Sequence, residues 1–132
     1  MFPMLRTGLL LIAHGSREPE ANADLLYLVT QMRNRGCYSM VEAAFLELAE
    51  PNIIEGGMRC VGQGAKRVLL VPYFLSAGVH VRRDLALARQ RLSELHPDVE
   101  FRLAEPLGRH PLLLEVVCQR AGESSPSSPT SS

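Results

Sequence analysis

Short apolar runs recur along the chain, and amphipathic segments separate them. Residues 9–13 and 67–73 are almost continuously apolar, a pattern typical of strands that are buried on both faces of a sheet, although Pro72 interrupts the second run. Residues 41–45 and 99–103 show a two-residue apolar period, which predicts strands with one more exposed face. The pattern therefore predicts four strands, with the fourth at an edge of the sheet.

The segments between these runs repeat apolar side chains at the spacing of an α-helix. They predict helices over residues 19–33, 54–61, 81–95 and 111–120. The second helix is the weakest of the four because it contains Gly56 and Gly57, and each glycine costs about 1 kcal/mol relative to alanine. The third helix is expected to end at His96, which precedes Pro97.

Strands and helices that alternate in this way form a parallel α/β sheet with helices on both faces. Right-handed crossovers in a small doubly wound sheet favour the strand order 2-1-3-4, in which the chain reverses direction between strands one and three. Ligands bind at that point, beyond the carboxyl ends of the strands. His14 follows the first strand, Glu47 ends the second and His80 lies in the loop after the third. We therefore expect these three side chains along one edge of the sheet.

The length of 132 residues and the mass of 14.6 kDa fit one compact domain. Hydrophobic residues make up 46% of the chain and charged residues 21%, which is the balance of a globular protein and argues against a disordered or fibrous one. We expect residues 1–121 to form a single α/β domain. Residues 122–132 are rich in serine and proline, and we expect them to form a disordered tail.

Charge and hydropathy exclude several classes of partner. Fourteen basic residues balance fourteen acidic ones, so the chain lacks the positive field on which nucleic-acid binding relies. The longest apolar runs are too short to span a membrane, and residues 1–13 lack the long apolar region and cleavage site of a signal peptide. We therefore expect a cytoplasmic protein that binds neither nucleic acid nor a membrane.

The three cysteines offer no recognisable metal motif. Cys37, Cys60 and Cys118 lie far apart in the sequence and form no C-x-x-C pair. We expect three buried, reduced thiols and no zinc site or iron–sulfur cluster.

Two histidines and one carboxylate are the main candidates for chemistry. Neutral imidazole binds divalent first-row metals well, and His14 and His80 with Glu47 nearby would leave coordination positions open for a substrate. The residues alone leave open the alternative that both histidines only cap loops. His96 lies at a helix C-terminus, where a histidine is favourable without any further function. His110 is expected to cap the last helix.

Two further segments could contact an anion. The turn at residues 14–17 joins a strand to a helix, so its backbone N–H groups could hold a negatively charged group, although Gly15 and Ser16 could equally serve only the turn and the helix cap. Arg82 and Arg83 lie near the start of the third helix, where the helix dipole disfavours cations. These arginines are either solvated surface residues or ligands of an anionic substrate.

Three motifs occur in the order of one known family. They read Leu-Leu-Ile-Ala-His-Gly-Ser-Arg at residues 10–17, Ala-Phe-Leu-Glu-Leu-Ala-Glu-Pro at 44–51 and Val-Pro-Tyr-Phe-Leu-Ser-Ala-Gly-Val-His-Val-Arg-Arg-Asp-Leu at 71–85. Over about residues 8–121 the sequence resembles the small class II tetrapyrrole chelatases, the sirohydrochlorin cobaltochelatases and ferrochelatases. This resemblance implies a chelatase-like fold. It also implies insertion of a divalent metal ion into a tetrapyrrole, for cobalamin or sirohaem synthesis, without a nucleotide cofactor.

The resemblance also assigns roles to the candidate residues. It makes His14 and His80 the metal-binding pair, and Glu47 the carboxylate that assists metal transfer or accepts a pyrrole proton. The metal ion is then a substrate, Co²⁺ or Fe²⁺ with Ni²⁺ as a further candidate, because ligands that suit one of these ions suit the others. The residues expected to bind the tetrapyrrole are Ser16, Arg17, Ser76, Arg82 and Arg83.

The chain holds one such domain, as do the short members of the family that act as homodimers, so the resemblance implies a homodimer. Two alternatives stay open. One is a metal or tetrapyrrole carrier that uses the same cleft without catalysis. The other is a phosphohydrolase of the histidine-phosphatase type. The phosphohydrolase is disfavoured because Ala13 rather than an arginine precedes His14, and phosphoryl transfer needs cationic groups around the phosphate.

Overall fold

A computed structural model describes residues 6–124 of the chain. Within this range, strands and helices alternate in the order β1 (Thr7–Ala13), α1 (Pro19–Arg35), β2 (Met40–Phe45), α2 (Ile53–Gly62), β3 (Arg67–Pro72), α3 (Val79–Leu95), β4 (Glu100–Leu103) and α4 (Pro111–Glu123). All eight predicted elements are present. Their bounds lie within two residues of the expected ones, except at the end of α4.

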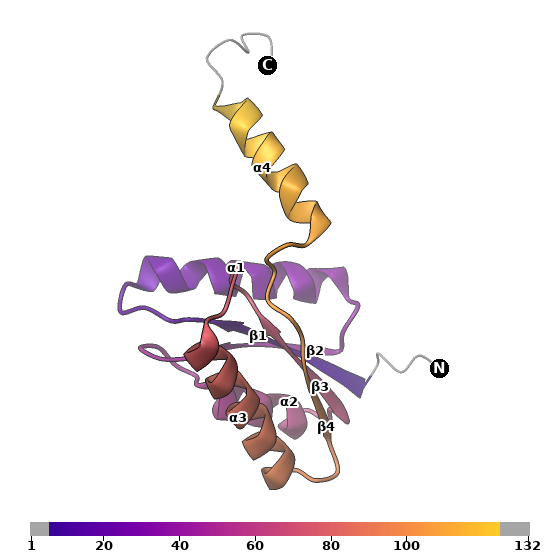
Figure 1. The fold of residues 1–132 in the computed structure, drawn as a ribbon. Coiled ribbons are helices and arrows are strands. Elements are labelled where there is room, and N and C mark those ends of the chain that lie inside the picture. The colour runs from indigo at the N-terminus through magenta and orange to yellow at the C-terminus, as the bar shows by residue number, and fades with distance from the viewer. Residues whose placement is uncertain (1–5, 125–132) are drawn as a thin grey trace.

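The strands form one parallel sheet of order β2-β1-β3-β4, which confirms the predicted topology. β1 is central, because Leu11 pairs with Ala43 of β2 on one side and with Val71 of β3 on the other. β4 pairs with β3 and forms one edge of the sheet. Since all four strands run in the same direction, their carboxyl ends lie along one edge of the sheet (Figure 1).

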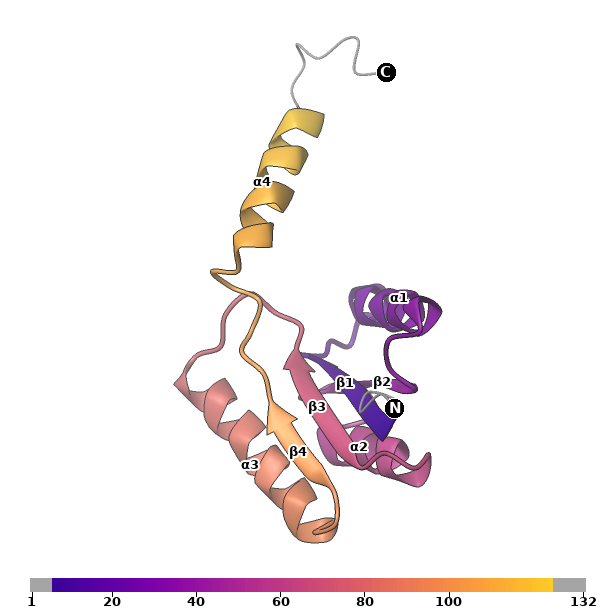
Figure 2. The same cartoon turned by 90° about the vertical axis from the view of Figure 1, so that its right-hand side faces the viewer.

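Helices pack on both faces of the sheet (Figure 2). On one face, α1 buries Leu25 and Val29 against β1 and β2. On the other face, α2 and α3 enclose the larger core cluster, to which α3 contributes Leu85 and Leu92. Burial alternates along β3: the side chains that face α2 and α3 are fully buried, and those on the α1 face are half-buried.

The two glycines that weaken α2 in isolation allow it to pack closely. A Cβ atom on Gly56 would lie 2.7 Å from Leu10 Cδ1, and one on Gly57 would lie 2.7 Å from Leu92 Cδ2. Any larger residue would therefore displace the buried Leu10 or Leu92 side chain, and the glycines let α2 approach β1 and α3 without that displacement. A capping box between Asn52 and Glu55 fixes the start of the helix and offsets part of the propensity cost.

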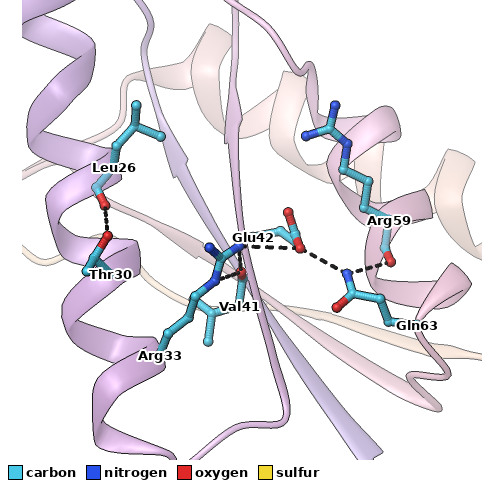
Figure 3. A network of polar contacts seen from close by, with 7 residues as sticks. All are labelled: Leu26, Thr30, Arg33, Val41, Glu42, Arg59 and Gln63. Carbon is cyan, nitrogen blue, oxygen red and sulfur yellow. Dashed lines mark hydrogen bonds and ion pairs between the residues drawn. The ribbon is translucent and has the colours of Figure 1, made fainter.

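A polar network ties α1, β2 and α2 together at the β2 edge of the sheet (Figure 3). The Arg33 guanidinium donates to the Val41 carbonyl oxygen from Nε at 2.9 Å and from Nη2 at 2.7 Å. It also forms an ion pair of 3.5 Å with Glu42. Gln63 donates to Glu42 Oε2 and to the Arg59 carbonyl oxygen, both at 2.9 Å. These contacts hold two helices on opposite faces of the sheet to the same edge strand.

α4 extends away from the rest of the fold, beyond the carboxyl ends of β3 and β4 (Figures 1 and 2). It continues through Glu123 with Ser124 as its C-cap, so residues 122 and 123, which the sequence assigned to the tail, belong to the helix. Residues 125–132 of that predicted tail lie outside the described residues. Between residues 6 and 124 no helix, α4 included, is long and apolar enough to cross a membrane.

All three cysteines are free thiols, but the prediction that all three are buried was wrong for two of them. Cys60 is buried in α2, and its burial, reinforced by the charge of Glu42, raises the pKa of the thiol to about 12. Cys37 and Cys118 are exposed. Cys118 is exposed because the helix that carries it leaves the body of the fold.

Candidate functional site

The three candidate catalytic residues lie at the carboxyl edge of the sheet. His14 follows the last residue of β1, and Glu47 lies two residues beyond the end of β2; both side chains are exposed. His80 was expected in a loop but lies in the first turn of α3. The helix begins early because Gly78 takes an extended conformation as N-cap and Val79 is already helical.

The backbones of His14 and Glu47 are fixed to each other. Hydrogen bonding between β1 and the chain beyond β2 continues past the strand ends, where Glu47 N–H donates to the His14 carbonyl oxygen at 3.0 Å. Gly15 has φ +95°, and a Cβ atom there would lie 1.8 Å from the Glu47 carbonyl oxygen. Only glycine fits this close approach, so Gly15 sets the relative position of His14 and Glu47.

The imidazole ring of His14 stacks on Phe74, with ring centroids 4.4 Å apart and an interplanar angle of 34°. Phe74 belongs to the connection between β3 and α3, and its carbonyl oxygen accepts a hydrogen bond of 3.0 Å from Leu107 N–H. His14 is therefore oriented by a ring on the segment that leads to His80. Phe74 lies within the third of the three motifs, but its sequence position gives no sign of this contact.

Asn22 holds the turn after His14 through two hydrogen bonds to the backbone of Ser16. Ser16 N–H donates to Asn22 Oδ1 at 3.0 Å, and Asn22 Nδ2 donates to the Ser16 carbonyl oxygen at 2.8 Å. The Ser16 hydroxyl oxygen accepts from Glu18 N–H, while Glu18 itself is the N-cap of α1. One of the predicted anion-binding N–H groups is thus already used. Arg17 is exposed beside this turn.

Arg82 and Ser76 lie together in a cavity of about 510 Å³ between the β3–α3 and β4–α4 connections. The cavity is lined by Leu75, Ser76, Arg82, Glu105, Pro106, Gly108 and Arg109. Arg82 Nε donates to the Ala77 carbonyl oxygen at 3.1 Å, and its Nη1 forms an ion pair of 3.4 Å with Glu105. Arg82 therefore joins the two connections, and its guanidinium is paired with a carboxylate of this chain.

Arg83 differs from Arg82, because its exposed side chain has no hydrogen bond or ion pair with any described residue. The first turn of α3 contains no acidic residue, and Gly78 supplies no side-chain cap to its N–H groups. The start of α3 therefore combines His80, two arginines and the positive end of the helix dipole. This combination is suited to an anionic ligand.

The remaining histidines have structural positions. His110 is the N-cap of α4, and its Nδ1 accepts a hydrogen bond of 3.2 Å from Leu112 N–H, as predicted. His96 is the C-cap of α3, at the end of the helix opposite His80. In the part of the chain that the structure describes, no three His, Cys, Asp or Glu side chains are grouped closely enough to hold a metal ion.

Two solved structures share this fold. SirB, a sirohydrochlorin chelatase from Bacillus subtilis subspecies spizizenii solved with cobalt, matches 91% of this chain and 51% of its own at 26% identity, with a TM-score of 0.83. A CbiX protein from Marinobacter aquaeolei VT8 matches 90% of this chain and 99% of its own at 33% identity, with a TM-score of 0.75. The structure is thus a chelatase-type α/β domain. The chain belongs to the CbiX family, whose sequence model matches residues 8–124.

Curated relatives carry chelatase names. The chain is 38% identical over 113 residues to the chloroplastic sirohydrochlorin ferrochelatase of Arabidopsis thaliana and 35% identical over 121 residues to a sirohydrochlorin cobaltochelatase of Priestia megaterium. The chain spans 50% of the length of the Arabidopsis protein and 39% of the length of the Priestia protein. By contrast, it aligns with 96% of a sirohydrochlorin cobaltochelatase of Methanocaldococcus jannaschii, at 28% identity.

Proposed function

We propose that this chain is a sirohydrochlorin chelatase that inserts a divalent metal ion into the tetrapyrrole, in cobalamin or sirohaem synthesis. The observation that carries the proposal is the position of His14. Its imidazole is exposed at the carboxyl edge of the sheet, its backbone is bonded to Glu47 and its ring is stacked on the segment that leads to His80. Relatives named for this activity align over 86–92% of the chain, which supports the same assignment.

The reaction exchanges one metal ion for two protons, because the four ring nitrogens bind the ion as two pyrrole N–H groups lose their protons. His14 and His80 hold the ion through neutral imidazole nitrogens, and so small a ligand set leaves coordination positions open to the ring nitrogens. A closed set of four protein ligands would retain the ion. Glu47 accepts one pyrrole proton as general base, and the second passes to water.

The metal ion enters as substrate, and Co²⁺, Fe²⁺ and Ni²⁺ all suit imidazole ligands. Solved structures of SirB hold cobalt in one case and Fe³⁺ in another, which supports a cation of this size. The proposal includes neither a nucleotide nor an iron–sulfur cluster, because exchange of a metal ion for two protons requires neither. Anaerobic incubation of the purified chain with sirohydrochlorin and each ion, followed by absorbance, tests the proposal.

Glu47→Gln is expected to lower kcat for metal insertion roughly 100-fold, which is within the range of a lost general base. Glutamine keeps the shape of the side chain but cannot accept the proton, so the dissociation constant for sirohydrochlorin should change far less than kcat. Glu50→Gln is the matched control, because Glu50 is also exposed in the segment after β2 but is not bonded to His14. An unchanged kcat in Glu47→Gln would rule out its role as base.

Arg83→Ala is expected to raise KM for sirohydrochlorin about two- to fivefold, the range of one exposed charge pair. The carboxylates around the tetrapyrrole rim would bind this guanidinium equally in the ground and transition states, so kcat should stay constant. Steady-state rates at several salt concentrations should also show a weaker salt dependence. Arg91→Ala, in the same helix and remote from its N-terminus, should match the unaltered chain. Unchanged KM in Arg83→Ala would make Arg83 an ordinary surface residue.

We also propose that the chain acts as a homodimer in the cytoplasm. One domain offers a single carboxyl edge to a large flat substrate, and relatives that align at 39% and 50% of their length have room for a second such domain. A second copy would supply the other side of a cleft. The cytoplasmic location is supported by the three free thiols, since reduced cysteines are typical of that compartment.

A further inference from the structure

An ion pair lies where two hollows at the carboxyl edge of the sheet meet. The cavity of about 510 Å³ described above and a smaller one of about 170 Å³ have Arg82, Glu105 and Pro106 in common. Arg82 and Glu105 form the ion pair of 3.4 Å that links the β3–α3 and β4–α4 connections. A ligand that fills either cavity therefore meets a guanidinium that already has a carboxylate partner.

The backbone that carries Glu105 is fixed, whereas its side chain is not. Ala104 N–H donates to the Leu70 carbonyl oxygen at 2.8 Å, and Leu107 N–H donates to the Phe74 carbonyl oxygen at 3.0 Å. The β4–α4 connection is thus bonded, on both sides of Glu105, to β3 and to the chain that follows it. The Glu105 side chain keeps 84% of its surface exposed. Exposed side chains change rotamer on the picosecond-to-nanosecond timescale, so Glu105 can leave its partner without any backbone movement.

Arg82 keeps its place when Glu105 turns away. Its Nε donates to the Ala77 carbonyl oxygen at 3.1 Å, a contact with the segment that leads into α3 and one that does not involve Glu105. The distance of 3.4 Å to Glu105 is longer than the about 2.7–2.9 Å of a strong charge-assisted hydrogen bond. The bond to the backbone therefore orients the guanidinium, and the weaker contact with Glu105 is the one that a ligand carboxylate could replace.

The charge of the larger cavity favours an anion, and Glu105 reduces that charge. Arg82 and Arg109 both line the cavity, and the Arg109 side chain has no hydrogen bond or ion pair with any described residue. Ser76 adds a hydroxyl group. Among the residues that the structure describes, Glu105 is the only carboxylate in the lining. The lining therefore carries one net positive charge with Glu105 and would carry two without it.

Metal insertion leaves unchanged the part of the tetrapyrrole that would meet this cavity. The exchange of a metal ion for two protons takes place at the ring nitrogens, whereas the carboxylates lie around the rim. A guanidinium that binds a rim carboxylate therefore binds substrate and product equally, and uniform binding of this kind does not raise kcat. It slows release of the product instead, unless a group of the chain competes for the same guanidinium.

We propose that Glu105 competes with the rim carboxylates for Arg82 and thereby shortens the residence of the tetrapyrrole on the chain. Glu105 pairs with Arg82 in the free chain, is displaced when the substrate binds and pairs again as the product leaves. The inference rests on the proposed chelatase function and names a residue that sets the affinity of its site. One carboxylate replaces another on the same guanidinium, so Arg82 has a partner at every stage.

The binding of sirohydrochlorin to Glu105→Gln, measured without metal so that no turnover occurs, tests the proposal. Glutamine keeps the length of the side chain but cannot form the ion pair. The dissociation rate constant from stopped-flow absorbance and the dissociation constant are both expected to fall about two- to fivefold, the range of one exposed ion pair. The cobalt complex of sirohydrochlorin should respond in the same way, because its rim is identical. Glu94→Gln, which removes the carboxylate paired with Arg91 in α3, is the matched control and should leave both constants unchanged.

Arg82→Ala separates competition from simple repulsion between Glu105 and the ligand. If Glu105 competes for Arg82, Glu105→Gln tightens binding in the unaltered chain and has little effect in the Arg82→Ala background. An equal gain in both backgrounds would show repulsion alone, and weaker binding in Glu105→Gln would show that Glu105 holds Arg82 in place for the ligand; either result would overturn the competition. A chain that binds sirohydrochlorin without this coupling loses only this inference, whereas a chain that does not bind sirohydrochlorin loses the proposed function as well.

Discussion

His14→Ala and His80→Ala are each expected to reduce metal insertion at least about 100-fold while the domain stays folded, since loss of even a supporting contact to a metal ligand costs 10- to 100-fold. His14 and His80 are exposed, so neither substitution opens a cavity. Loss of the His14 ring also removes the stacking on Phe74, which is worth about 1 kcal/mol. Turnover and thermal unfolding measured on the same preparations separate the two effects.

His96→Asn is the control that shows whether loss of any histidine side chain lowers turnover. His96 is the C-cap of α3, at the opposite end of the helix from His80, and asparagine is acceptable at a helix C-terminus. This variant should keep its turnover. Turnover near that of the unaltered chain in His14→Ala or His80→Ala would remove that histidine from the metal site.

Gly15→Ala is expected to destabilise the fold by at least about 2 kcal/mol and to reduce turnover about 100-fold, because a misplacement of about 1 Å at a catalytic group has an effect of that size. The new Cβ atom would lie 1.8 Å from the Glu47 carbonyl oxygen, so the backbone on one side must move. His14 and Glu47 are the residues that would then separate. Chemical denaturation and single-turnover rates measure the two consequences.

Gly36→Ala separates backbone strain from this close approach. Gly36 has φ +73°, comparable with the +95° of Gly15, but nothing lies within 4 Å of the position of its Cβ atom. It should therefore lose only about 1–2 kcal/mol and keep full turnover. If Gly15→Ala and Gly36→Ala behave alike, the contact with Glu47 does not position the site.

The order of elements followed from periodicity, and the sheet topology followed from that order together with the preference for right-handed crossovers. A continuous apolar run needs cover on both faces, so residues 9–13 and 67–73 were expected inside the sheet, and β1 and β3 do lie in its middle. Burial on both faces holds for β1 but not for β3, where Leu69 and Val71 are only half-buried. β2 was expected to have a more exposed face, but every residue of it except half-buried Glu42 is buried.

Gly56 and Gly57 made α2 the weakest of the predicted helices, and the helix nevertheless forms. Their propensity cost is visible in the sequence, whereas the contacts with Leu10 and Leu92 that require them depend on the packed fold.

Side-chain partners within the candidate site could not be predicted in the same way. Phe74 meets His14 because β3 lies beside β1, and the sequence distance of 60 residues gives no sign of it. Asn22 reaches back to Ser16 across the first turn of α1, where a serine alone suggested a cap. The exposed position of α4 could not be predicted from the sequence. Its apolar pattern is typical of a helix that packs on a sheet, whereas in the structure nearly all of its residues are exposed. The close approach of Gly108 to the Leu75 carbonyl oxygen lies in the connection before it and gives no signal in the sequence.

The most direct test of the proposed function is an anaerobic metallation assay with purified chain, excess sirohydrochlorin and Co²⁺, Fe²⁺ or Ni²⁺ in turn, followed by absorbance. We expect many equivalents of metallated tetrapyrrole per chain with at least one ion, at a rate well above that without protein, and loss of this acceleration in His14→Ala. Binding of metal or tetrapyrrole at one equivalent without acceleration would contradict the account and identify a carrier instead.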